Sequence, residues 1–255
     1  MTNKDGFWGH IEVLRWMLLR CVAALTVFAV FAFCFKELLF KHLVLAPMRA
    51  DFITYRLLRA TGLPVAVQGA ELINISLTAQ LMTHIRISFF AALAVVFPYL
   101  IAELWFFVRP ALYAKERHTA ALAVTAIFAQ FYLGLALAYF IIFPLTFNFL
   151  STYQVSESVT NSITLSSYID TFTGLLLSMG LVFELPVAAW FFARIGVLKA
   201  SLLRRGRRLA VVLTLVAAAL ITPSTDIFTM CLVAMPLYLL YELSIVVAGK
   251  AETKE

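Results

Sequence analysis

Charged residues are scarce in this chain of 255 residues: Asp, Glu, Lys and Arg make up 13% of it, whereas 63% is hydrophobic. A soluble domain carries about a quarter charged and about half apolar residues. The shortage of charge therefore excludes an ordinary soluble domain. Together with a mean hydropathy of +0.94, it predicts an integral membrane protein whose surroundings are the lipid bilayer.

Cysteine is scarce too, and the common catalytic motifs are missing. Cys21, Cys34 and Cys231 lie in or at the edge of apolar stretches, and an odd number without cluster spacing predicts neither a disulfide framework nor a metal site. The sequence has no His-Glu-x-x-His, no Gly-x-Ser-x-Gly and no phosphate-binding glycine loop. We therefore expect no enzymatic activity, no cofactor and no nucleic-acid partner.

What the chain does contain is six apolar stretches, and a membrane-spanning helix needs about 20 such residues. They predict an all-α integral membrane fold with six transmembrane helices in one transmembrane domain, residues 1–255. The fifth stretch is short, about 14 residues or about 21 Å, so it needs a thinner bilayer or support from its neighbours. The stretches are about 16–35, 85–108, 119–150, 168–193, 209–222 and 227–248, with an outer loop over 36–83.

Basic residues are unevenly placed: three lie before or within the start of the first stretch, three in 109–118 and six in 194–208, whereas 151–167 and 223–226 have none. The positive-inside rule therefore predicts that both termini lie in the cytoplasm. The loop 36–83 carries five basic residues as well, but long loops follow the rule weakly. Its apolar clusters alternate with these basic residues, which predicts short amphipathic helices over the bundle.

Prolines interrupt four of the predicted spans, at Pro98, Pro144, Pro186 and Pro236. Each removes a backbone donor and bends its helix, so several kinked helices predict a concave bundle. Pro110 lies instead in a charged turn, Phe107–Arg117, and should end the second span near Arg109. A new helix should start near Glu116, at the mouth of the bundle. A carboxylate that faces water there costs little free energy and can bind a basic partner.

Glu103, Glu184 and Glu242 lie within apolar stretches, where a carboxylate is expensive and is usually functional or paired. Glu103 and Glu242 lie near helix ends and can reach the interface. Glu184 lies deeper, which leaves three alternatives: it is protonated, it pairs with a polar group in the bundle, or it receives a polar group from another protein's helix.

Two further acidic residues lie near helix ends. Glu12 and Arg15 are three residues apart on a helix that continues into the first span, so they share a face. Asp226 follows the turn Thr222–Thr225 and should cap the last helix.

These motifs resemble those of the TatC family, the multi-spanning subunit of the twin-arginine protein translocase, and the resemblance runs from about His10 to Glu242. Several blocks occur in the family's order, which makes chance similarity improbable. They are Phe107-x-x-Pro110-Ala111-Leu112-Tyr113-x-x-Glu116-Arg117, Phe131-Tyr132-x-Gly134, Phe143-Pro144-Leu145, Phe183-Glu184-x-Pro186 and Pro236-x-Tyr238-x-x-x-Glu242.

The resemblance implies a receptor that binds the consecutive arginines of signal peptides on folded cargo. Glu116 matches the family's main acidic contact, with Phe107 and Arg117 beside it, and planar guanidinium groups favour carboxylates. Glu184 matches an intramembrane glutamate that implies contact with single-span partners of the TatA/TatB type. The resemblance further implies the bacterial cytoplasmic (inner) membrane, transport driven by the proton motive force, and compatibility with a homo-oligomer.

Two positions depart from the family pattern. Val13 stands where relatives have a glutamate directly before Leu-Arg. Glu12, the candidate second arginine contact, comes one residue earlier. On a helix this offset turns the side chain by about 100°. Asp226 is a second candidate contact for partner helices. Four residues after it, Met230 stands where many relatives have glutamine. Pro110, Pro144 and Pro186 match structural positions.

A different class of function stays open, a secondary transporter or channel in which Glu184 is an intramembrane ion or proton site. Such a transporter should show an internal repeat and several polar groups in mid-span. This sequence has no strong repeat and one such carboxylate, Glu184.

Overall fold

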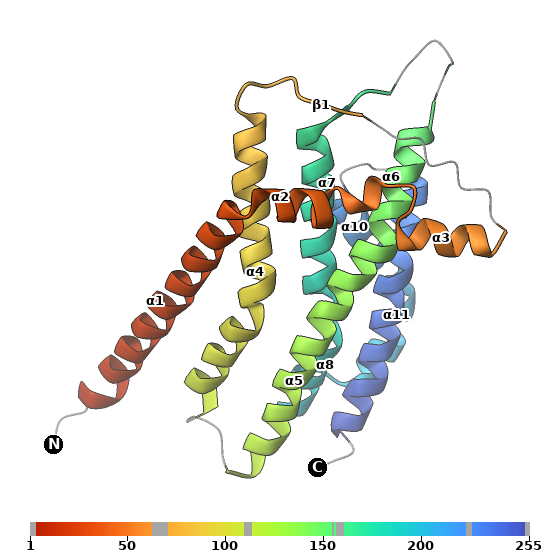
Figure 1. Ribbon diagram of the computed structural model, residues 1–255. Helices are drawn as coiled ribbons and strands as arrows, with labels where there is room; N and C mark the ends of the chain where they lie inside the picture. Colours follow the sequence, from red (N-terminus) through yellow and green to blue (C-terminus); the bar gives the residue numbers. More distant parts are fainter. Residues whose placement is uncertain are drawn as a thin grey trace. The chain divides into compact units, whose positions relative to one another are not determined.

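The computed structural model describes residues 4–62, 71–109, 114–154, 156, 161–222 and 226–252, and these residues are mostly helical (Figure 1). They divide into two compact units, Met1–Phe40 with Leu81–Phe128, and Lys41–Gln80 with Ala129–Glu255. The first unit contains α1 (Lys4–Cys34), most of α4 (Ala79–Val108) and the first part of α5 (Ala114–Leu137).

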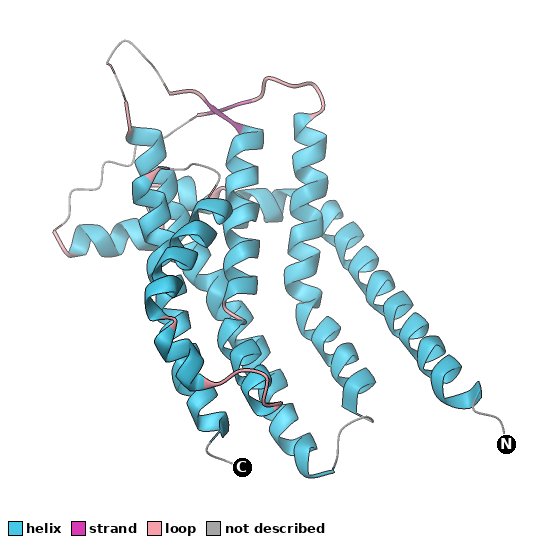
Figure 2. Ribbon diagram, turned by 180° about the vertical axis from the view of Figure 1, so that it is seen from behind, coloured by secondary structure: helices cyan, strands magenta, loops and turns pink. Residues whose placement is uncertain are grey.

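The loop predicted over 36–83 contains short helices, which confirms that prediction. They are α2 (Lys36–Leu38), a π-helical segment (Leu39–Val44), a 3₁₀ turn (Ala46–Met48) and α3 (Ile53–Ala60). The loop also contributes β1 (Leu72–Ile73), which pairs in parallel with β2 (Ile163–Thr164), as the magenta strands in Figure 2 show.

The second unit continues α5 with a π-helical segment, Ala138–Ile142, and then with α6 (Phe143–Thr152). Its remaining helices are α7 (Leu165–Val182), α8 (Leu185–Arg194), α9 (Ala200–Arg205), α10 (Arg207–Ile221) and α11 (Ile227–Glu252).

Five helical stretches among the described residues are long and apolar enough to cross a membrane: Ile11–Cys34, Ala79–Phe107, Ala121–Thr152, Leu165–Arg194 and Ile227–Glu252. The chain is therefore a mostly helical, multi-pass membrane protein. The short stretch predicted over 209–222 forms α10, which has 15 residues. It is about 22 Å long, less than the roughly 30 Å of a hydrocarbon core.

The stretch predicted as one helix over 168–193 is broken in two. α7 ends at Val182 and α8 begins at Leu185, with Pro186 in its first turn. The proline ring clashes with the carbonyl four residues earlier, that of Val182, and the proline has no N–H to donate. Pro186 therefore explains the break between Val182 and Leu185, and Glu184 lies at this break.

At Pro144 the chain stays helical, and the π-helical segment Ala138–Ile142 leads directly into α6. Proline leaves the carbonyl four residues earlier, that of Phe140, without its helical donor. The hydroxyl of Thr54 in α3 donates to that carbonyl, and the hydroxyl of Tyr55 donates to the carbonyl of Pro144 at 2.9 Å. Tyr55 is fully buried, and burial raises its pKa to about 12, so it keeps the proton that it donates.

Two glycines allow α5 and α7 to approach closely. A Cβ atom at Gly134 would lie 2.6 Å from the carbonyl oxygen of Met179, and one at Gly180 would lie 2.9 Å from the ring of Phe131. Small residues at such crossings let helix backbones pack in membranes, where hydrophobic burial drives association weakly. The backbone of Met179 cannot move aside as the side chain of Phe131 can. Gly134 is therefore less tolerant of a larger residue than Gly180.

We predict that Gly134→Ala lowers the free energy of unfolding by about 1–3 kcal/mol, because the added methyl group overpacks the contact with Met179. The change is measured by thermal unfolding in detergent, with size-exclusion chromatography as the readout of folded protein after heating. Gly174→Ala in α7 is the matched control, since a Cβ there meets nothing within 4 Å. Equal melting temperatures for the two variants would contradict the close approach.

Candidate functional site

The charged turn lies between α4 and α5. α4 ends at Val108, as Pro110 predicts, and residues 110–113 lie outside the described part of the chain. α5 begins at Ala114, so the backbone places residue 116 in the first helical turn. A helix N-terminus has free N–H groups and a partial positive charge, which favour an acidic residue there. The side chains of Glu116 and Arg117 lie outside the described residues, as does Pro110.

The N-terminal candidate, Glu12, lies on α1, which continues without a break into the predicted first span. Glu12 is exposed and makes no hydrogen bond or ion pair with another described residue. Arg15 turns instead to the neighbouring ring of Trp16, with its guanidinium carbon 5.8 Å from the ring centroid. The carboxylate of Glu12 is thus available to a ligand.

Glu103 on α4 forms an ion pair with Arg20 on α1. Its carboxylate accepts from Arg20 Nε at 3.0 Å and Nη2 at 2.8 Å, and from the hydroxyl of Tyr99 at 2.8 Å. The Glu103 side chain is only 13% exposed. This two-point guanidinium–carboxylate geometry is the strong form of the interaction. Glu103 thus has a partner inside the first unit, which the expectation that it reaches the interface did not include.

The ion pair fixes how α1 lies against α4 near the candidate ligand contacts. Phe107, partly buried in the last turn of α4, follows Glu103 by four residues, and residues four apart share a helix face. Glu12 precedes Arg20 by eight residues, about two turns. A ligand that contacts Glu12 and Phe107 would therefore meet helices whose positions Arg20 and Glu103 determine.

Glu184 lies at the break between α7 and α8. Both of its carboxylate oxygens are buried, and neither has a hydrogen-bond partner among the described residues. Of the three alternatives for Glu184, pairing inside the bundle is thus not seen in the described part of the chain. A buried polar group without a partner costs free energy, so Glu184 is suited to accept a donor from outside.

Glu242 on α11, predicted to reach the interface, is paired as well. It accepts from Arg207 Nη2 at 2.8 Å and from the hydroxyl of Tyr238 at 3.0 Å. Glu252, at the end of α11, accepts from the backbone N–H of Ala200 at 2.6 Å. These contacts hold the arginine-rich segment of α9 and α10 against α11.

Asp226 caps α11, as predicted. Its Oδ1 accepts from the backbone N–H of Thr229 at 2.7 Å, and α11 begins at Ile227. The preceding turn residues, 223–225, lie outside the described part of the chain. The cap gives Asp226 a structural role, to which a contact with a partner helix would be added.

A family model described as Sec-independent protein translocase protein (TatC) matches residues 9–236, most of the chain. The chain belongs to the TatC family. The resemblance seen in the sequence motifs is thereby confirmed. The family is a membrane component of a protein translocase that performs transport and no enzymatic reaction, so the expectation of a non-enzyme is also confirmed.

Individual TatC proteins match nearly the full chain. The protein from Blattabacterium sp. subsp. Periplaneta americana is 31% identical over 99% of this chain and 98% of its own length. The protein from Escherichia coli (strain K12) is 31% identical over 96% of this chain and 90% of its own length. A crystal structure described as twin arginine translocase receptor TatC is 28% identical, with a TM-score of 0.73 over 95% of this chain and 99% of that one.

The partners of Glu103 and Glu242 were missed by sequence reasoning, although a signal exists. Each glutamate follows a tyrosine by four residues, Tyr99 and Tyr238, and each tyrosine hydroxyl donates to it. A Tyr-x-x-x-Glu spacing inside an apolar stretch thus marks a carboxylate held within the protein. Which arginine completes each cluster depends on helix packing, which spacing along one helix does not reveal.

We predict that Arg20→Met and Glu103→Gln each lower the melting temperature, because each leaves the other group without its partner in an apolar setting. The double variant should lose less than the sum of the single losses, as a double-mutant cycle measures for residues in direct contact. Glu12→Gln, which removes an exposed carboxylate without a partner among the described residues, should leave the melting temperature unchanged. Strict additivity of the two single effects would refute the coupling.

Proposed function

We propose that this chain is the receptor for twin-arginine signal peptides and the core subunit of a Tat translocase that exports folded proteins. The observation that carries the proposal is the match over 95% of the chain to a twin arginine translocase receptor. The charged turn supports it, because the backbone places Glu116 in the first turn of α5, at the end of a membrane-spanning helix.

In this proposal, Glu116 binds the arginine pair of the signal peptide, with Phe107 and Arg117 beside it and Glu12 as the second carboxylate. Guanidinium groups are planar and donate to carboxylates at two points, whereas the lysine ammonium is a point charge. The unpaired, exposed carboxylate of Glu12 supports its part in this site. Arg20 and Glu103 then serve as positioning residues between α1 and α4.

The proposal includes the arrangement in the membrane. α10 serves as the sixth span, and both termini lie in the cytoplasm, since the basic residues gather in the segments that would then face it. The membrane is the bacterial cytoplasmic (inner) membrane, across which the proton motive force drives export.

The partners in this proposal are single-span proteins of the TatA/TatB type. Glu184 receives a polar group from a partner helix, which would satisfy the two buried oxygens that have no partner among the described residues. Asp226, at the start of α11, is a second contact. The same unpaired carboxylate favours one alternative, an ion or proton site in a secondary transporter or channel.

We predict that Glu116→Gln abolishes export of cargo with an Arg-Arg signal and weakens signal-peptide binding about thirty-fold or more, the loss of about 2 kcal/mol expected when one partner of a charge pair is removed. Export assays in cells and photocrosslinking from position 116 measure the two effects. Glu37→Gln, at an exposed glutamate in α2, is the matched control and should leave both unchanged.

The crosslink at position 116 should disappear when the peptide carries Lys-Lys in place of Arg-Arg. A second crosslinker at position 12 tests whether Glu12 contacts the same peptide. Export that survives in Glu116→Gln, with no arginine-dependent crosslink at either position, would leave family membership intact and overturn the assignment of the site.

We predict that Glu184→Ala weakens co-purification of TatA/TatB-type partners about ten-fold, the scale of an interhelical hydrogen bond of 1–2 kcal/mol. Signal-peptide crosslinking at position 116 should be unaffected. Glu184→Gln keeps a hydrogen-bonding side chain of the same size and should retain most of the association.

Equal loss of partner and signal-peptide binding in Glu184→Ala would contradict this division between the two sites. Ion-gradient-dependent uptake by liposomes containing the purified chain, abolished by Glu184→Gln, would favour the transporter instead.

A further inference from the structure

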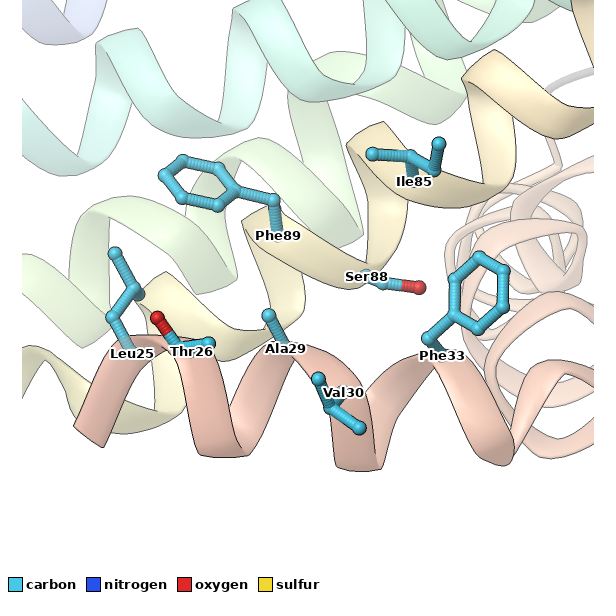
Figure 3. A pocket seen from close by; sticks show the side chains of 8 residues that line it. All are labelled: Leu25, Thr26, Ala29, Val30, Phe33, Ile85, Ser88 and Phe89. Atoms are coloured by element: carbon cyan, nitrogen blue, oxygen red, sulfur yellow. The ribbon is translucent and has the colours of Figure 1, made fainter. Parts of the chain in front are cut away.

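A pocket of about 340 Å³ lies between α1 and α4 in the first unit. It is lined almost wholly by apolar side chains, as Figure 3 shows: Leu25, Ala29, Val30, Phe33, Ile85 and Phe89. Val30, Ile85 and Phe89 are exposed. Because both helices are candidate membrane spans, the medium that meets these exposed side chains is the bilayer.

The pocket contains one hydroxyl group that lacks a partner. Ser88 is only 2% exposed, and its Oγ is buried without a hydrogen bond to any described residue. Figure 3 shows this oxygen in the space between Phe33 and Ile85. Thr26, the other polar lining residue, already donates to the carbonyl of Val22 at 2.8 Å. Ser88 is thus the lining residue whose buried hydroxyl has no hydrogen-bond partner among the described residues.

A second polar atom lies next to the pocket. His84, one turn before Ser88 on α4, stacks on Phe33 with ring centroids 3.9 Å apart, and its Nε2 is also buried without a partner among the described residues. Two unpaired polar atoms beside an apolar pocket match an amphiphile, which has a long apolar part and hydrogen-bond acceptors at one end. A purely apolar occupant would leave both polar atoms unsatisfied.

His84 and Ser88 lie in the first three turns of α4, toward one end of a candidate membrane span. α4 has 30 residues, and its length of about 45 Å equals the thickness of a bilayer with its headgroups. His84 lies about 7.5 Å from the start of the helix, and Ser88 about 13.5 Å. The hydrocarbon core begins about 7 Å below the outer edge of the headgroups. On an upright helix that begins at this edge, His84 would lie at the boundary of the core and Ser88 one turn inside it, so both face the part of a lipid nearest its ester groups.

We propose that this pocket binds one phospholipid of the leaflet in which α1 ends and α4 begins. An acyl chain occupies the apolar space between Leu25, Ala29 and Phe89. Ser88 donates its hydroxyl to an ester carbonyl of the lipid, and His84 lies beside the same polar region. A lipid explains why an apolar pocket open to the bilayer contains a buried hydroxyl without a partner.

Native mass spectrometry of the full chain in detergent, after incubation with a defined diester phosphatidylethanolamine, tests the proposal. The wild type should retain one lipid per chain. Ala29→Phe fills the pocket and should reduce retention at least about five-fold, the effect expected when contacts of a buried chain are lost. Ala23→Phe is the matched control, since Ala23 lies on the exposed surface of α1 outside the pocket.

A diether analogue, which lacks ester carbonyls, tests the role of Ser88. The wild type should retain the diester lipid about five-fold better than the diether lipid, as one hydrogen bond predicts. Ser88→Ala should remove this preference without changing retention of the diether lipid. Equal retention of both lipids by the wild type would overturn the contact with Ser88.

Equal lipid retention by Ala29→Phe and Ala23→Phe would overturn the pocket as the lipid site. If Ala29→Phe instead weakened only self-association or co-purification of a partner helix, the occupant would be protein and the proposal would be wrong. None of these outcomes bears on Glu116, so the lipid site and the signal-peptide site are tested separately.

Discussion

A polar group within the hydrocarbon region of a membrane has no water to bond with, so it must find its partner in the protein or in something that the protein binds. The structure follows this constraint at several places. Glu103 is bonded by Arg20 and Tyr99, and Glu242 by Arg207 and Tyr238. The carbonyl freed by Pro144 accepts from Thr54. These bonds connect segments far apart in the sequence and therefore determine how the helices of each unit pack.

The exceptions to the constraint are as informative as the cases that obey it. Gln130, Thr146 and Thr229 have buried side-chain oxygens without a partner among the described residues, and Glu184 and Ser88 do as well. Their surroundings differ: Glu184 lies at a helix break in the second unit, and Ser88 lines an apolar pocket in the first. A carboxyl group can both accept and, when protonated, donate, which suits a polar side chain of another helix. A hydroxyl in a narrow apolar space suits a single acceptor on a lipid.

Composition and spacing predicted the membrane class, the helical segments of the loop 36–83, the end of α4 before Pro110 and the cap at Asp226, because each depends on nearby residues. The effect of a proline was less predictable. α4 continues through Pro98 and α11 through Pro236, whereas Pro186 separates α7 from α8. The arginine partners of Glu103 and Glu242 were missed for the same reason: Arg20 and Arg207 come from other helices, and only packing brings them to the glutamates. Glu116 was identified from the charged turn and then matched to the family motif, and its side chain lies outside the described residues.

The positions of the acidic residues fit the energetic cost of each proposed recognition step. Stripping water from two arginines is expensive, so a receptor for them is best placed near the ends of the membrane-spanning segments. Glu12 is exposed at the start of the span Ile11–Cys34, and residue 116 lies in the first turn of α5. There the carboxylates gain charge-assisted bonds without burying an ion. The proposed recognition of a partner helix would take place inside the bilayer, where one hydrogen bond replaces an unsatisfied group and specificity needs no net charge. Glu103 lies between these extremes, because it is a carboxylate inside a span whose charge is neutralised by Arg20. It positions α1 against α4, and in the proposed site other residues contact the ligand.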